Sequence, residues 1–224
     1  FLTPDADFGL LSAELETTQA MYGPNHLMGN LMDSHDQVRF MAYADGDLKL
    51  DTDDAGRRAW FDQPNADHAE SFRKVALYLA YMTAIPGLPT LYYGDEIGLS
   101  GSSDPDNRRM MRFAPHLNAS EAQLLKETQQ IYNLRRQLPA LRYGDFLPLK
   151  AEQDLFAFLR SDYNQRILVV LNKKDQAQEI RLSLPEVHRS TRAQELLTGT
   201  VINLHNQELL TTLQAYSAAF FVLE

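Results

Sequence analysis

Two apolar runs in this chain each end abruptly in a cluster of polar side chains. Leu31-Met32 leads into Asp33-Ser34-His35-Asp36, and the run over residues 88–93 leads into Gly94-Asp95-Glu96. A helical pattern over residues 68–85 lies between them, and a strand–helix–strand succession predicts that the two strands are parallel. Because parallel strands end at one edge of their sheet, the polar clusters are expected to meet there. The sequence therefore predicts carboxylate chemistry at that edge.

The hydrophobic pattern changes near residue 140. Before it, apolar spacing predicts helices over residues 5–22, 55–61, 68–85 and 120–138. After it, from about residue 141, alternation predicts strands over 155–160, 166–172, 180–184, 200–204 and 217–223. Short strands without intervening helices are typical of an antiparallel sandwich. The predicted fold class is α/β followed by all-β, with one domain over residues 1–139 and a second over 140–224. Ser120 and Gln123 are expected to cap the helix that Pro139 ends.

Composition excludes several kinds of site and partner. The chain has 224 residues, no cysteine and a net charge of −9, so it has neither disulfides nor thiolate metal sites and is a poor candidate for binding polyanions. We therefore expect no nucleic-acid partner, and the absence of a long apolar run predicts no membrane partner. The chain begins with Phe1 rather than Met, which indicates a fragment or a processed product.

Three segments in order resemble motifs of the alpha-amylase family of glycoside hydrolases. GNLMDSHDQVRF (29–40) resembles that family's strand seven, PGLPTLYYGDEIGLSG (86–101) its strand eight, and SSDPDNRRMMRF (102–113) the following loop. The Asp-Pro-Asp-x-Arg-Arg version is most similar to the neopullulanase, cyclomaltodextrinase and maltogenic amylase branch. The tail over 138–223 resembles the family's C-terminal sandwich. The resemblance implies the last two strands of a (β/α)8 TIM barrel with their helices, followed by an antiparallel β-sandwich.

The resemblance also implies roles for individual residues. Asp36 matches the carboxylate that stabilises the cationic transition state, and His35 matches a histidine that hydrogen-bonds the same sugar. Asp104 and Arg108 match a pair that grips another sugar of the substrate. Arg39 is interpreted as a residue that orients this cluster. A fixed carboxylate beside an oxocarbenium-like transition state stabilises it more than the neutral ground state, which agrees with this assignment.

Two further carboxylates of the family mechanism are missing from this sequence. A retaining glycosidase needs a nucleophile and an acid/base roughly 5 Å apart. No Gly-x-Arg-x-Asp motif is present, and Glu14 and Glu16 fall within a predicted helix. The resemblance thus implies part of a retaining hydrolase acting on maltooligosaccharides, cyclodextrins, pullulan or starch, and inactive by itself. The alternatives are a transglycosylase or sucrose-active enzyme of the same family, a non-catalytic barrel relative, and a sandwich that acts as a carbohydrate-binding module.

No cofactor and no metal are predicted for this chain. An acidic segment containing Asp45, Asp47, Asp51, Asp53 and Asp54 does not fit the EF-hand calcium loop, whose sixth position needs glycine and here holds Leu50. A solvated acidic loop is the favoured interpretation. The resemblance leaves room for calcium only in the missing upstream part.

Three other expectations concern surfaces and location. Trp60 and Phe61 either stack on a sugar or pack in the core. A partial barrel leaves the Leu31 strand without a neighbour, which predicts a homodimer or self-association of the fragment. The family resemblance favours a periplasmic or secreted location.

Overall fold

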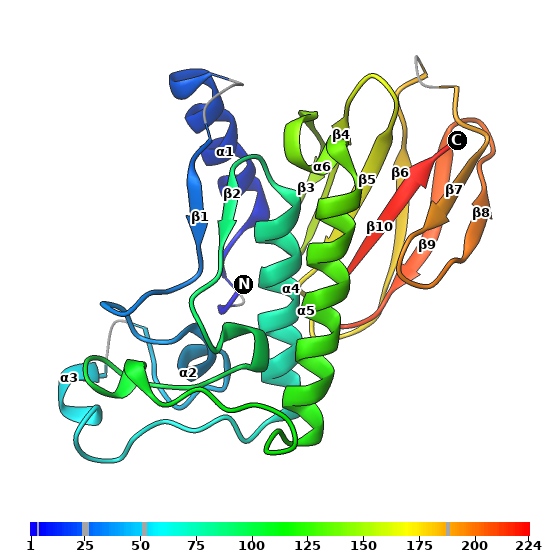
Figure 1. Ribbon diagram of the computed structural model, residues 1–224. Helices are drawn as coiled ribbons and strands as arrows, with labels where there is room; N and C mark the ends of the chain where they lie inside the picture. Colours follow the sequence, from blue (N-terminus) through cyan, green and yellow to red (C-terminus); the bar gives the residue numbers. More distant parts are fainter. Residues whose placement is uncertain (4, 24–26, 51–52, 187–188) are drawn as a thin grey trace.

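The computed structural model describes residues 1–3, 5–23, 27–50, 53–186 and 189–224. Two long helices separate a pair of short strands from a larger sheet (Figure 1). The α-helices are α1 (Phe8–Tyr22), α2 (Phe40–Ala44), α3 (Ala55–Arg58), α4 (Ala69–Ala84), α5 (Ala119–Gln137) and α6 (Pro139–Tyr143), and the 3₁₀ turns are η1 (Asp95–Ile97) and η2 (Asp106–Arg108). The strands are β1 (Gly29–Leu31), β2 (Leu88–Thr90), β3 (Asp145–Ala151), β4 (Leu155–Ser161), β5 (Arg166–Asn172), β6 (Gln178–Ser183), β7 (Arg192–Glu195), β8 (Val201–Asn203), β9 (Glu208–Leu213) and β10 (Ser217–Leu223).

The two apolar runs form the strands β1 and β2, which pair in parallel as predicted. Gly29 lies opposite Leu88, so both strands run toward the same group of loops, at the bottom of Figure 1. Gly87, immediately before β2, has a φ of 112°, and a Cβ at this position would lie 2.6 Å from the carbonyl oxygen of Met28. Only glycine permits this close approach of the two backbones.

Two expectations for these strands are wrong. The second strand ends at Thr90 instead of Tyr93, because the amide of Asp95 bonds to the carbonyl of Tyr92 and turns the chain. The sequence predicts buried strands, but Leu31 and Leu88 are 46% and 52% exposed. Among the described residues this sheet has only two strands, so no third strand pairs with their outer edges.

Helix α4 is the central element of the structure and confirms the predicted helix over residues 68–85. It packs against α5 and against β10 (Figure 1). Ile85, after its last turn, adopts an extended backbone because Pro86 follows. Its deepest apolar side chains are Val75, Leu79 and Met82.

The N-terminal cap of α5 differs from the prediction. Asn118 is the cap instead of Ser120: its Oδ1 accepts from the amide of Glu121 at 2.9 Å, and the Glu121 carboxylate accepts from the amide of Asn118 at 2.8 Å. This arrangement satisfies two N–H groups that have no partner within the helix. Gln123 bonds instead to the side chain one turn further along. Pro139 follows the end of α5 and begins α6, where its fixed φ is tolerated.

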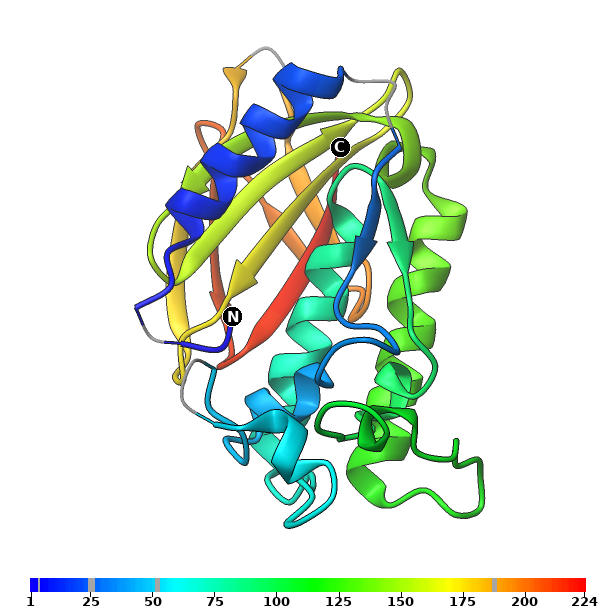
Figure 2. The same ribbon diagram turned by 90° about the vertical axis from the view of Figure 1, so that its left-hand side faces the viewer.

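The C-terminal strands form a six-stranded antiparallel sheet in the order β3-β4-β5-β10-β7-β8, as the predicted fold class requires. The pair β6–β9 packs on one face of this sheet, and α1, α4 and α6 lie on the other. Figure 2 shows α1 lying across this face, where it contacts β3 and β4. Because β4 and β5 are covered on both faces, their side chains form nearly continuous apolar runs.

The sequence pattern does not reveal β3, β7 and β9, and the alternation expected from residue 141 begins only at Asp145. Strand β3 lies at the edge of the sheet, where Pro148 is tolerated and the register shifts before Lys150. Strand β7 has a single apolar residue, and the leucines of β9 do not alternate regularly with polar residues, so neither strand shows the expected pattern. The proposed domain boundary after residue 139 falls inside α6 and stays a prediction. No helix in the described part of the chain has the length and apolar character that a bilayer span needs.

Two buried arginines fasten the C-terminal end of α4 to neighbouring parts of the chain. Arg160 of β4 donates to the carbonyl oxygens of Ala84, at the end of α4, and of Gly144, before β3. Arg135 of α5 donates to the carbonyl oxygens of Thr83, Ile85, Gly87 and Leu141. Both guanidinium groups therefore lie at the C-terminal end of α4. The last carbonyl groups of a helix have no partner within it, so they favour positive charge.

Replacing Arg135 with methionine should lower the free energy of unfolding by about 3 kcal/mol, because buried carbonyl oxygens lose their donor. Urea unfolding followed by circular dichroism measures this loss. Arg136→Met is the matched control, since Arg136 is the next residue of the same helix and is exposed. Equal stability of the two variants would contradict the assigned role of Arg135.

Self-association of the chain also stays a prediction, supported by the exposed apolar side chains of β1 and β2. The unmodified chain should elute above its monomer size and bind a hydrophobic dye. The double variant Leu31→Lys, Leu88→Lys should shift elution toward the monomer. A monomeric, dye-free wild type would show that this surface does not drive association.

Candidate functional site

Four of the predicted site residues lie together where β1 and β2 run into loops. We refer to this end of the molecule as the loop edge. The Nε2 atom of His35 is 3.2 Å from Oδ2 of Asp36. The guanidinium of Arg108 lies 3.7 Å from Oδ1 of Asp36 and 3.3 Å from Oδ1 of Asp104, and its Nε also donates to the carbonyl oxygen of His35. The tertiary structure thus brings the carboxyl end of one strand into contact with a loop about 70 positions further along the chain.

This cluster of Asp36, His35, Asp104 and Arg108, the exposed cluster, presents its polar groups to solvent. The side chains of Asp36 and His35 are 71% and 62% exposed. Carboxylate oxygens accept hydrogen bonds from hydroxyl groups, and the guanidinium and imidazole can donate to hydroxyl oxygens. Arg108 lies between the two carboxylates and offsets part of their negative charge. The arrangement is suited to binding a polyhydroxylated, uncharged ligand.

Arg39 lies beneath the exposed cluster and is fully buried. Its Nη1 donates to the carbonyl oxygen of Tyr93 at 2.7 Å and to Oδ1 of Asp95 at 3.0 Å, and its Nε donates to the carbonyl oxygen of Asn107 at 2.9 Å. The guanidinium carbon also lies 3.9 Å from the centre of the Tyr92 ring. These contacts join the segments that follow β1 and β2 to the loop that carries Arg108, so they support the predicted orienting role of Arg39.

Asn107 is a site residue that the sequence reasoning missed. It is fully buried, and its Nδ2 donates to the carbonyl oxygens of His35 at 2.8 Å and Gln37 at 2.9 Å. It therefore fixes the backbone on both sides of Asp36. The only signal in the sequence is its position beside Arg108 in the Asp-Pro-Asp-Asn-Arg-Arg segment, and an asparagine in a polar loop does not by itself indicate burial.

Asp33 and Asp95 are two further buried carboxyl groups at Arg39. Asp95 is 3.0 Å from the guanidinium and Asp33 is 4.0 Å from it, so both carboxyl groups face the same cation. Asp33 also accepts from the amide of Phe40 at 2.7 Å. Burial, with a smaller contribution from the negative charge of Asp33, raises the pKa of Asp95 to about 9, and Arg39 opposes this rise.

One guanidinium cannot neutralise two buried carboxylates. One of the two carboxyl groups therefore stays protonated at neutral pH. Burial also raises the pKa of Asp33, while the Phe40 amide and Arg39 lower it. We assign the proton to Asp95, because its pKa is raised to about 9 and its amide donor, that of Tyr92 at 3.2 Å, is farther away than the Phe40 amide is from Asp33, at 2.7 Å. We refer to Asp33, Arg39 and Asp95 as the buried triad.

The carboxylates of the acidic segment around residues 45–54 accept hydrogen bonds from neighbouring parts of the chain. Asp45 accepts from the amide and the ring of His68, and Asp47 accepts from the amide of Asn65. Asp53 and Asp54 accept from nearby backbone amides, and Asp51 lies outside the described residues. Where the structure describes the chain, no group of three or more His, Cys, Asp or Glu side chains is arranged to hold a metal ion.

Comparisons with known proteins identify relatives of this chain. Residues 145–220 match the family described as Maltogenic Amylase, C-terminal domain. The chain is 30% identical over 220 residues to neopullulanase 2 from Thermoactinomyces vulgaris, covering 96% of this chain and 33% of that protein. It is 28% identical over 202 residues to a cyclomaltodextrinase from Geobacillus thermopakistaniensis, covering 89% of this chain and 30% of that protein.

The solved structures show the same relationship. The crystal structure of an alpha-amylase from Geobacillus thermoleovorans, complexed with acarbose, superposes with a TM-score of 0.78 at 25% identity. The match covers 98% of this chain and 44% of that one. This chain belongs to the alpha-amylase family of glycoside hydrolases. It falls in the branch of neopullulanases, cyclomaltodextrinases and maltogenic amylases, corresponds to the C-terminal part of its relatives, and spans about a third of the length of the curated ones.

Replacing Asp95 with asparagine should make the stability of this amylase-family chain less dependent on pH. A carboxyl whose pKa is about 9 in the folded state and near 4 when unfolded contributes stability that is complete below about pH 4 and is lost as the pH rises to about 9. The wild type should lose up to about 1.4 kcal/mol per pH unit through this proton, and Asp95→Asn should not.

Urea unfolding between pH 5 and pH 9 measures the slope of stability against pH. Asp36→Asn is the control, because that carboxylate is exposed and lies outside the buried triad; it should keep the slope of the wild type. An Asp95→Asn variant with an unchanged slope would show that Asp95 is ionised in the folded chain.

Proposed function

We propose that this chain is part of a retaining glycoside hydrolase that acts on α-glucans, and that its exposed cluster forms part of the substrate site. The observation that carries the proposal is the contact of Arg108 with both Asp36 and Asp104. This contact supports the proposal, because it brings the carboxylate expected at the reacting sugar close to the pair expected to hold a second sugar. Members of the family act on maltooligosaccharides, cyclodextrins, pullulan or starch, and these are the proposed substrates.

Asp36 is proposed to stabilise the positive charge that develops on the sugar ring. Asn107 holds the backbone on both sides of Asp36, and Arg108 lies 3.7 Å from its carboxylate, so the position of Asp36 is largely set before substrate binds. A preorganised negative group beside a developing cation lowers the free energy of the transition state more than that of the ground state. His35, Asp104 and Arg108 are proposed to bind sugar hydroxyls and to hold the ring in register with Asp36.

The described residues support the expectation that this chain alone does not hydrolyse glycosides. Asp33 and Asp95 are buried with Arg39, and Asp104 is paired with Arg108. Glu14 and Glu16 lie on α1, at the end of the molecule away from the loop edge in both views (Figures 1 and 2). The nucleophile and the acid/base are therefore proposed to come from upstream sequence.

Binding of maltooligosaccharides by the chain itself tests the site. The wild type should be retarded in native gels that contain soluble starch, and Arg108→Met should lose most of this retardation, about tenfold in affinity, because charge-assisted hydrogen bonds are removed. Arg136→Met, which changes an exposed arginine of α5, should migrate like the wild type. The absence of any retardation would overturn the proposed function of the cluster.

Catalysis is tested in a longer polypeptide that joins this chain to its upstream sequence. There, Asp36→Asn should reduce kcat by about 10²–10³-fold, the usual effect of removing one preorganised electrostatic group. Reducing-sugar release from starch measures this effect, and product analysis with maltotriose distinguishes hydrolysis from transglycosylation. Full activity of Asp36→Asn would show that this aspartate does not stabilise the transition state.

A further inference from the structure

Trp60 and Phe61, in the turn after α3, are exposed aromatic side chains without a role in the proposed substrate site. Each is 69% exposed, so the expectation that they pack in the core is wrong. Two adjacent large aromatic groups exposed to water are costly unless a ligand or partner covers them. Trp60 is the single tryptophan of the chain.

The turn that presents these rings is held in one conformation. Arg58 donates to the carbonyl oxygens of Asp62 at 2.7 Å and Asp47 at 2.9 Å, and its Nε lies 3.3 Å from the Asp62 carboxylate. Asp62 has a φ of 61°, in the left-handed region that most residues avoid. The amides of Trp60 and Phe61 both bond to the carbonyl of residue 57. The backbone that carries the two rings is therefore held in place before any ligand arrives, which lowers the entropy cost of ordering this turn on binding.

This aromatic turn is also fastened to the loop that carries the exposed cluster. The hydroxyl of Ser102 donates to the carbonyl oxygen of Ala55 in α3 at 2.6 Å, and the amide of Ser102 donates to Asp106 at 2.7 Å. Asp104 lies two positions further along the same loop. In both views the segment around α3 lies beside the loop of η2 (Figures 1 and 2). The aromatic pair thus belongs to the same edge of the molecule as the substrate cluster.

We propose that Trp60 and Phe61 form an aromatic platform that binds a second part of the α-glucan chain held by Asp104 and Arg108. The inference rests on the proposed function and extends it to substrates several glucose units long. Aromatic rings cover the apolar C–H face of a glucose ring, and the ligand must be uncharged or cationic, because Asp62 exposes its carboxylate beside the rings. A neutral glucan meets both conditions.

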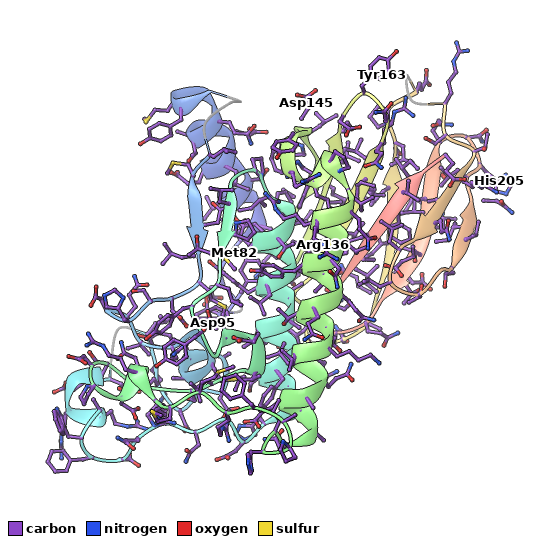
Figure 3. All side chains as sticks on the ribbon, in the orientation of Figure 1. Met82, Asp95, Arg136, Asp145, Tyr163 and His205 are labelled. Carbon is purple, nitrogen blue, oxygen red and sulfur yellow. The ribbon has the colours of Figure 1, made fainter. Side chains whose placement is uncertain are left out.

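The single tryptophan makes the test direct. Titration of the unmodified chain with maltoheptaose should change the tryptophan emission to a saturable end point, whereas maltose, a much shorter ligand, should reach that end point only at far higher concentration. Trp60→Ala and Phe61→Ala should each weaken maltoheptaose binding about five- to tenfold in starch-gel retardation. Tyr163→Ala is the matched control: Tyr163 is 100% exposed in the β4–β5 turn at the opposite end of the molecule and should bind like the wild type (Figure 3).

Each outcome separates the platform from the proposed function. If the wild type binds maltoheptaose and Arg108→Met weakens it, but Trp60 emission and the affinity of both aromatic variants are unchanged, the platform is overturned and the substrate site stands. If the wild type does not bind at all, the proposed function fails. If Trp60→Ala converts an oligomer to a monomer without changing sugar affinity, the rings contact a second copy and the platform is overturned. Unfolding midpoints of Trp60→Ala and Trp60→Phe verify that both variants fold.

Discussion

A single buried guanidinium holds the loop edge of this protein together. Arg39 contacts the turn after β2 through Tyr93 and Asp95, and it contacts the following loop through Asn107. These segments have little regular structure of their own, so their positions depend on hydrogen bonds. The planar guanidinium reaches several acceptors at once, which a lysine ammonium on a flexible stem cannot do with fixed geometry. The exposed cluster lies on top of this arrangement and takes its shape from it.

Burial divides the charged groups of this edge into two kinds. Asp33, Arg39 and Asp95 are within 3% of full burial, where an uncompensated charge is expensive, so the triad retains a proton and remains near neutral. Asp36, His35 and Arg108 are open to solvent, where their charges cost little and can act on a ligand. The buried groups supply rigidity, and the exposed groups supply the proposed chemistry.

Much of the fold can be predicted from local sequence patterns. Residues 166–172 form β5 as predicted, because a strand covered on both faces has a continuous apolar run. Pro148 in β3 and the single apolar residue of β7 hide these two strands from a prediction based on sequence. Pairing with neighbouring strands stabilises both. The helix cap is Asn118, two positions before the predicted Ser120. Asn118 with Glu121 and Ser120 with Gln123 fit the same capping pattern, and only the backbone geometry distinguishes them.

The sequence by itself determined the two parallel strands, the polar groups at their ends and the family to which the chain belongs, since all of these are recorded in contiguous segments. Only the tertiary structure decided that Arg108 lies against Asp36, that Asp95 is buried with a raised pKa, and that Trp60 is exposed. Those properties depend on contacts between segments far apart in the chain. Desolvation and ion pairing are set by the groups that surround a side chain in space, which no local pattern specifies.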